Sequence, residues 1–512
     1  MTKDIVKNLV FLISVIVLGR FTKDFYVLFL GFMGMIYAWQ NRNGKALGIY
    51  LILPLLTQIN PIIYPHSGFY SIISRVSMML ITLGFIMGSA GRARGHEKLP
   101  VLSILVYILF ACISSATGYL PIVSYLKIIN FLIFIFGLYF GVMNIHHHVE
   151  ELKSVRSMMM AIAIFVIVGS ALSRLVPGIS YMSAIKIAFK TGDIGYAGAV
   201  VERSAGVSLF CGVTNHSQFL APYLACVAGV VMCDMIFITK KPDKLHFGLL
   251  ALVPILEFMT RSRTGLFSFA VMGAMSVFYA LPKLRSRSTR LRRALKSAVV
   301  AGVVVVVAAA AVVEAKNNGI TRWLRKSDVL GGYTEQSLTD AVMSSRQGLI
   351  GMAMADFHES PLLGKGFQVA FYSPMHLDEN RISSYFSSPI EKGFVFTMVL
   401  GEGGIIGFAA FILFLIMFYS GCAKMRYYAT ATMFTVYLAT NFSEATFFSP
   451  SGGGGAMWVT CVVGGFVIDI INKYGKSNNV VMIPFANPEE GIEEDGRLRR
   501  GIPRNPIAPE RF

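Results

Sequence analysis

Charged residues are scarce in this sequence. They make up 14% of the 512 residues, whereas 54% are hydrophobic. A soluble protein of this length would carry about 25% charged residues. Apolar runs of about 16 to 25 residues recur along the chain instead, close to the ~20 that cross a bilayer as a helix. The sequence therefore predicts an all-α polytopic membrane protein.

Other absences exclude whole classes of function. There is no GxxxxGK[ST] phosphate loop, which argues against an ATP-driven pump. The six cysteines form no CxxC pair and no Cys/His set has zinc spacing, so we expect inert thiols and no metal or other cofactor. The net charge of +18 comes from basic residues in short loops between apolar runs, so we expect no nucleic-acid partner.

Fourteen apolar segments are candidate transmembrane helices, with a range of 12 to 14 because the second and thirteenth are short. They lie at about 5–20, 24–40, 46–63, 69–90, 99–116, 121–142, 157–174, 208–238, 246–260, 264–281, 297–313, 391–419, 427–441 and 455–472.

Basic connections orient these segments. They follow every even-numbered segment, for example at 41–45, 91–98 and 282–296. Lys and Arg accumulate on the cytoplasmic side, so both termini are expected in the cytoplasm. The tail at 473–512 is rich in Pro, Gly, Glu and Arg and is expected to be disordered.

Two of the outward-facing connections are long. The first lies at about 175–207 within the eleven-helix part at 1–313, and the second at 314–390 precedes the last three helices at 391–472. Enlarged loops on one face favour a function on that face, here the outer one, although a tolerated insertion explains either loop alone. The second loop is expected to be partly helical. It contains most of a polar stretch, Ser344–Gly407.

Three arginines lie on the predicted outer face, although Lys and Arg generally accumulate on the cytoplasmic side. These are Arg203, Arg263 and Arg346, each followed by glycine within three residues. The planar guanidinium suits phosphate, so together they can bind a lipid pyrophosphate and stabilise a leaving diphosphate. The alternative is that each side chain merely reaches lipid headgroups.

Glu391 is a candidate base at the outer membrane surface, able to accept a proton from an incoming sugar hydroxyl. Lys392 beside it can hold it ionised or bind phosphate. Ser388 to Glu391 also has the spacing of a helix capping box, which is a sufficient structural role. His376 is a rival base, as is His358. Asn215 and His216 are expected to line the same outer cavity as Arg203.

Glu402 lies about three turns inside the twelfth segment, in Leu-Gly-Glu-Gly-Gly-Ile-Ile-Gly. An ionisable group at such depth suggests a functional role if the helix is continuous. The flanking glycines can instead mark a break that places Glu402 at a helix end. Glu257 and Asp234 lie near the ends of their segments, where an ionisable group calls less for a functional explanation than one deep in the membrane.

Four segments, in order across about residues 200–410, together resemble the bacterial O-antigen ligase and O-antigen polymerase superfamily. They are ERSAGVSLFCGVTNHSQFLA, MTRSRTGLFSFAVM, SRQGLIGMAMADFHESPLLGKGF and LGEGGIIGFAAF. The resemblance implies metal-independent, inverting glycosyl transfer from an undecaprenyl-pyrophosphate carrier on the periplasmic face. Arg203, Arg263 and Arg346 match the family positions that hold the pyrophosphate. The ligases usually carry His-Asn where this chain has Ser-Pro-Ile-Glu-Lys, so Glu391 is a base by position only, which favours a polymerase.

The sequence therefore predicts a glycan polymerase or ligase of exopolysaccharide or O-antigen synthesis. Its expected partners are the lipid-linked glycan, a glycan acceptor, membrane lipids and other polysaccharide assembly proteins. The alternative is a transporter or flippase of an anionic lipid-linked glycan. Transporters tend to show inverted repeats and paired broken helices, which the sequence does not reveal. The product, new glycosidic bonds or translocation alone, distinguishes the two.

Overall fold

The computed structural model describes residues 3–22, 24–65, 70–89, 99–146, 148–176, 210–239, 243–260, 262–285, 350–369, 394–442, 446–450 and 452–474. Within these ranges the chain is helical, and an isolated β-bridge joins Ile59 to Thr214. The prediction of an all-α protein is confirmed for this part of the chain. Several predicted features lie outside it: the loop at 177–207, the segment at 297–313, most of the loop at 314–390, the tail from 475, and the site residues Arg203, Arg346, His376, Glu391 and Lys392.

The helices follow the predicted apolar segments. Every predicted segment that falls within the described ranges contains one of them. They are α1 (Lys3–Thr22), α2 (Asp24–Trp39), α3 (Asn43–Leu56), α4 (Tyr70–Ser89), η1 (Pro100–Ser103), α5 (Ile104–Ala116), α6 (Pro121–Ile145), α7 (Val149–Ser173), α11 (Ser217–Cys233), η3 (Asp234–Ile238), α12 (Lys244–Thr260), α13 (Arg263–Arg285), α19 (Val395–Met425), α20 (Tyr428–Thr440), α21 (Gly452–Trp458), η5 (Val459–Val463) and α22 (Gly464–Tyr474).

Seven helices of the described residues are long and apolar enough to cross a membrane. Three shorter apolar helices, at 24–39, 43–56 and 100–116, fall below that length. The chain therefore has the features of a multi-pass membrane protein, but fewer helices meet this criterion than the 14 spans expected from the sequence.

The outer helices present apolar side chains to their surroundings. Phe21 at the end of α1 is 77% exposed and Phe25 at the start of α2 is 83% exposed. Soluble monomers rarely expose contiguous apolar surface of this kind. A lipid environment explains it, because hydrocarbon does not penalise exposed phenylalanine.

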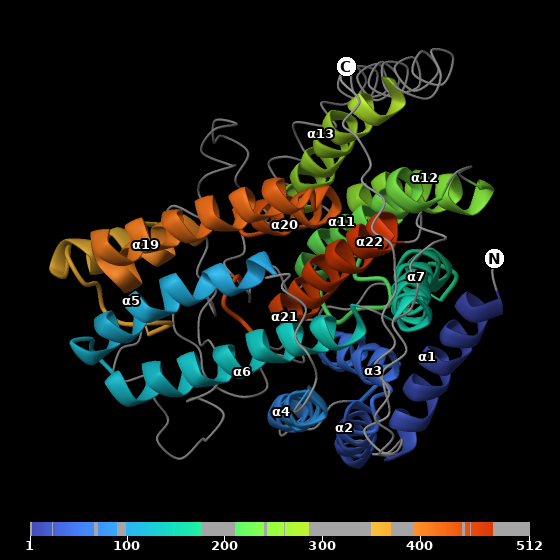
Figure 1. Cartoon of the computed structure of the whole chain (residues 1–512), viewed down its shortest axis with the longest axis horizontal. Coiled ribbons are helices and arrows are strands. Elements are labelled where there is room, and N and C mark those ends of the chain that lie inside the picture. Colours follow the sequence, from blue (N-terminus) through green and yellow to red (C-terminus); the bar gives the residue numbers. More distant parts are fainter. Residues whose placement is uncertain are drawn as a thin grey trace, which may run out of the picture.

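The fold is built around two central helices. Figure 1 shows α5, α6, α19 and α20 extended along the long axis, while α2 and α4 are seen end-on. Near the middle of the view lie α11 and the continuous helix of α21, η5 and α22, whose most apolar windows are 78% and 94% buried, compared with 22% for α1. The centre of the molecule is therefore contributed by residues 217–238 and 452–474.

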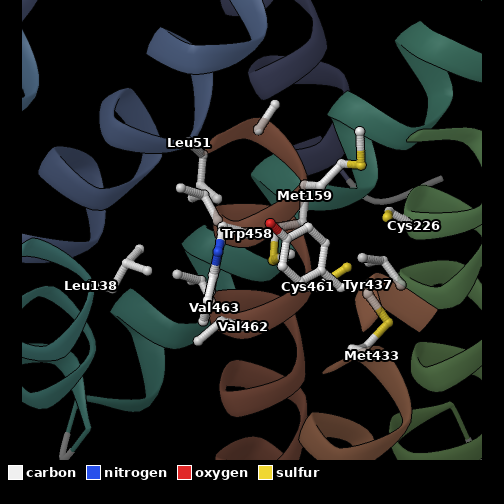
Figure 2. Packing of buried hydrophobic residues seen from close by; sticks show 14 of the residues in the cluster. Leu51, Leu138, Met159, Cys226, Met433, Tyr437, Trp458, Cys461, Val462 and Val463 are labelled. Atoms are coloured by element: carbon white, nitrogen blue, oxygen red, sulfur yellow. The ribbon is translucent and has the colours of Figure 1, made fainter. Parts of the chain in front are cut away.

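Aliphatic, aromatic and sulfur-containing side chains fill this centre (Figure 2). Trp458 is fully buried, and its indole N–H donates a hydrogen bond to the carbonyl oxygen of Phe447. Cys226 and Cys461 also lie there, and all six cysteines are free, with five of them buried. The thiols are thus packing residues, as predicted.

A buried carboxylate caps α20 from another helix. Asp469 of α22 is 2% exposed and accepts hydrogen bonds from the backbone N–H groups of Ala429, at 3.0 Å, and Thr430, at 2.8 Å. The Thr430 hydroxyl donates a third, at 2.8 Å. The first N–H groups of a helix lack partners within it and favour a negative charge. Asp469 therefore fixes the start of α20 against α22.

Candidate functional site

Helix α19 is broken close to Glu402. The helix runs from Val395 to Met425, but Gly404 within it has φ 60° and ψ −163°. Only glycine adopts this conformation without strain, because it has no Cβ. The break places the 1% exposed Glu402 at the end of a short helical piece. Of the two interpretations of the glycine-rich sequence, the broken helix is the one observed.

A loop at 360–369 fills the break with its backbone. Lys365 N–H donates to the carbonyl of Gly401 at 3.1 Å, and Gly366 N–H donates to that of Glu402 at 2.9 Å. In the other direction, Ile405 N–H donates to the carbonyl of Pro361 at 2.9 Å. A break leaves backbone N–H and C=O groups without their helical hydrogen-bond partners, and such groups need other partners when they are buried. The loop supplies them.

The contact is so close that it requires glycine on both sides. A Cβ on Gly404 would lie 2.4 Å from the carbonyl group of Leu362. A Cβ on Gly364, where φ is +70°, would lie 2.4 Å from the carbonyl group of Glu402. The Pro-Leu-Leu-Gly-Lys-Gly-Phe and Glu-Gly-Gly-Ile-Ile-Gly motifs are therefore two halves of one structure, called here the loop–break contact (residues 360–369 with 401–406).

The end of α5 is the third component of this contact. The Ser114 hydroxyl donates to the carbonyl of Glu402 at 2.9 Å, and also to that of Leu363. The Ser115 hydroxyl accepts from Phe367 N–H at 3.2 Å. Sequence reasoning missed both serines. The available signal was two adjacent hydroxyl residues at the end of an apolar segment, a pattern too common to single out.

A buried lysine holds the end of the same loop. Lys127 of α6 is 3% exposed, and its ammonium group donates to the carbonyl of Gln368 at 2.9 Å. Gln368 has φ 56° and donates through its side chain to the carbonyl of Phe448 at 2.7 Å. The loop is thus tied to α5, α6, α19 and the segment before α21. His358, a candidate base, lies just before it, in a helical stretch at 350–359.

Arg263 and Asn215 lie at the starts of two neighbouring helices. Arg263 is the first residue of α13, and Asn215 precedes α11, whose N-cap His216 accepts from Gln218 N–H at 3.0 Å. The helices touch near these ends, because a Cβ on Gly265 would lie 2.6 Å from that of Ala221. Both residues are half-buried. Of the predicted substrate-binding residues, these two are described, and they share one end of the α11–α13 pair.

Glu257 is more deeply buried than its position suggested. Its side chain is fully buried in α12, and a Cβ on Gly265 would meet its carboxyl oxygen at 2.0 Å. Among the described residues, neither carboxyl oxygen of Glu257 has a hydrogen-bond partner. The glycine of the Ser-Arg-Thr-Gly motif is therefore the residue that makes room for this carboxyl group, two positions from Arg263.

Asp234 is satisfied by an ionic cluster at the other end of α11. Arg156 donates to it at 2.8 Å, and the His246 Nε2 atom lies 3.1 Å from its carboxylate. The other ring nitrogen of His246 lies 2.5 Å from Asp243, and this hydrogen bond lowers the pKa of the Asp243 carboxyl group. A structural role joining α7, η3 and α12 accounts for this cluster.

Within the described ranges, no three His, Cys, Asp or Glu side chains are grouped to hold a metal ion. Comparison of the chain with protein-family models and with curated proteins finds no match.

Proposed function

We propose that this protein is an inner-membrane glycosyltransferase. It polymerises or ligates a glycan delivered on undecaprenyl pyrophosphate, for exopolysaccharide or O-antigen synthesis. The loop–break contact is the observation that carries the proposal. Two motifs that resemble the O-antigen ligase and polymerase superfamily are separated by some 40 residues. Even so, Gly404 of one motif lies directly against the backbone of Leu362 in the other, and Gly364 lies against that of Glu402. Chance similarity of two short motifs gives no reason for such a contact.

In the proposed reaction, an acceptor hydroxyl attacks the sugar carbon that is bonded to the diphosphate oxygen. The carbon–diphosphate bond breaks, a new carbon–oxygen bond forms with inversion, and the hydroxyl proton passes to Glu391 or His376. Arg203, Arg263 and Arg346 bind the pyrophosphate and stabilise the charge that develops on it. Lys392 and Asn215 contribute further contacts to the substrate.

The proposed topology has 14 spans with both termini in the cytoplasm. The loops at 175–207 and 314–390 then face the periplasm, on the side of Arg263 and Asn215. The start of α13 beside the start of α11 supports this, because both helices then enter the membrane from the outer face. Membrane lipids and other polysaccharide assembly proteins are the proposed neighbours.

One observation favours the second candidate, a transporter or flippase of an anionic lipid-linked glycan. Transporter sites are often built from discontinuous helices, and α19 is discontinuous at Gly404. In such sites the freed backbone groups bind the substrate or its coupling ion. In this chain the loop at 360–369 takes up these groups, which favours a rigid support for an enzyme site over a transport site.

Activity is expected to survive removal of divalent metal. Purified protein incubated with a lipid-linked repeat unit in EDTA should form product at the rate seen with added Mg²⁺, since cationic side chains neutralise the leaving diphosphate. The measurement is product formed against time by gel or mass spectrometry. Complete loss of product on chelation, restored by Mg²⁺, would contradict the metal-independent mechanism.

A further inference from the structure

Two segments from distant parts of the chain pair with each other where α3 ends and α11 begins. Ile59 and Thr214 form an isolated antiparallel bridge. Next to it, the Asn215 N–H donates a hydrogen bond to the carbonyl of Gln58 at 2.8 Å. Gln58 and Asn215 therefore lie directly opposite each other, one position from the bridge.

The bridge turns these two side chains away from the core. Neighbouring residues in paired strands point to opposite faces. Ile59 and Thr214 are fully buried, whereas Gln58 and Asn215 are half-buried. Residues opposite each other in an antiparallel pair have Cβ atoms about 5 Å apart. The pairing thus places two carboxamide groups side by side, accessible from one side, called here the carboxamide pair (Gln58 and Asn215).

The carboxamide pair has hydrogen-bonding capacity that the described protein does not use. The Asn215 Oδ1 atom is buried and has no hydrogen-bond partner among the described residues. Gln58 is oriented by its Nε2 atom, which donates to the carbonyl of Thr57 at 3.2 Å and to the Thr57 hydroxyl at 3.1 Å. An acceptor that is buried without a partner costs free energy and is rare in folded proteins. A ligand that donates a hydrogen bond would remove this cost.

Glycines leave the Gln58 amide uncovered on the side of the central helix at 452–474. A Cβ on Gly452 would lie 3.3 Å from the Gln58 Nε2 atom, and a Cβ on Gly453 would lie 3.7 Å from its Oε1 atom. Both glycines are half-buried, at the start of a run of four glycines. Any larger residue at these positions would place its side chain over the amide.

Both paired segments are fixed before a ligand arrives. The Thr57 hydroxyl donates to the carbonyl of Pro54 at 2.6 Å, and the Val213 N–H donates to the Ser170 hydroxyl of α7 at 3.3 Å. Groups that are already held in place lose less conformational freedom on binding. The carboxamide pair is therefore a preorganised polar surface.

The donors and acceptors of the pair indicate the class of ligand. A carboxamide accepts through its oxygen and donates through its nitrogen, and a hydroxyl also does both. A phosphate group only accepts, so it has nothing to donate to the oxygens of Gln58 and Asn215. Two adjacent carboxamides suit neighbouring hydroxyl groups, as a sugar ring presents them.

We propose that Gln58 and Asn215 together bind sugar hydroxyls of the lipid-linked glycan. This inference rests on the proposed function, and it adds Gln58 to the residues that contact the substrate. Asn215 lies at the same end of the α11–α13 pair as Arg263. The sugar site is therefore on the same side of the molecule as the site proposed for the pyrophosphate.

Binding without turnover tests the sugar site. Purified full-length protein in detergent is offered undecaprenyl pyrophosphate with and without one attached repeat unit, and bound lipid is measured by native mass spectrometry. Both probes carry the same pyrophosphate, so the ratio of their affinities reports the contacts to the sugars. We expect the wild type to bind the glycan-linked probe at least tenfold more tightly. Equal affinity for the two probes would overturn the proposal.

Variants locate these contacts. Gln58→Leu and Asn215→Leu should each lower the preference about threefold or more, as expected for one lost hydrogen bond, with unchanged affinity for the bare carrier. Gln40→Leu, at an exposed amide after α2, should keep the wild-type preference. A folded variant of Gln58 or Asn215 that also keeps it would overturn the proposal. If Gln58→Leu does not fold, Asn215→Leu decides alone, because the Asn215 oxygen has no partner to lose.

The binding result is separate from the test of glycosyl transfer. A protein that forms no glycosidic bond, but prefers the glycan-linked probe and loses this preference in both variants, would retain the sugar site and reject the glycosyltransferase. A protein that forms polymer while both variants keep the wild-type preference would retain the glycosyltransferase and reject the sugar site.

Discussion

Replacing Arg263 with alanine should slow glycan transfer about 10²- to 10³-fold, the usual effect of removing one group that stabilises developing negative charge. Arg263 begins α13, which packs against the first turns of α11, and it is half-buried. Arg263→Lys should recover only part of the rate, because lysine keeps the charge but loses the planar fork of donors. The measurement is the initial rate of product formation by purified protein.

Arg174→Ala is the matched control for this loss. Arg174 is an exposed arginine that follows α7 and precedes the loop at 175–207. It carries the same charge without a place in the proposed site, so its variant should transfer glycan at the wild-type rate. The size-exclusion profiles of the three variants must match that of the wild type. A folded Arg263→Ala protein with unchanged rate would remove Arg263 from the mechanism.

Replacing Gly404 with alanine should disrupt the loop–break contact. The backbone conformation alone costs about 1–3 kcal/mol for a residue with a side chain. The added Cβ would also lie 2.4 Å from the carbonyl group of Leu362, so the loop must move away from α19. We expect the variant to lose its monodisperse size-exclusion peak after mild heating and to show no detectable glycan transfer.

Gly407→Ala is the control on the same helix. A Cβ at Gly407 would meet nothing within 4 Å, and alanine is the better helix former by about 1 kcal/mol. This variant should be as heat-resistant as the wild type or more so, and should keep its activity. If Gly404→Ala behaved like Gly407→Ala, the loop–break contact would have no role in stability or function.

The positions of the helices were predictable from hydrophobicity, because each apolar segment must satisfy its backbone internally and so becomes a helix. The break at Gly404 was partly predictable, since the glycine cluster around Glu402 offered a break as one of two interpretations. What fills the break was not predictable. The hydrogen bonds between 360–369 and α19 join residues distant in sequence, and periodicity carries no information about such pairs.

The predicted site was only partly accessible to sequence reasoning. Arg263 and Asn215 were singled out by charge bias and proximity to helix starts, and both lie at one end of the α11–α13 pair. Ser114, Ser115 and Lys127 were missed, because each acts on a loop whose position follows from tertiary structure alone. Glu257 was undervalued, since its burial depends on Gly265 from the next helix. The roles of Arg203, Arg346, His376, Glu391 and Lys392 remain predictions from the sequence.

The most direct test of the proposed glycosyltransferase is the product made by purified protein in vesicles supplied with an undecaprenyl-pyrophosphate-linked repeat unit. We expect mass spectrometry to find glycan longer than the supplied unit, joined by new glycosidic bonds, with undecaprenyl pyrophosphate released for each bond formed. Recovery of unit-length, carrier-linked glycan alone, moved from one face of the vesicle to the other, would contradict the proposal and identify a transporter.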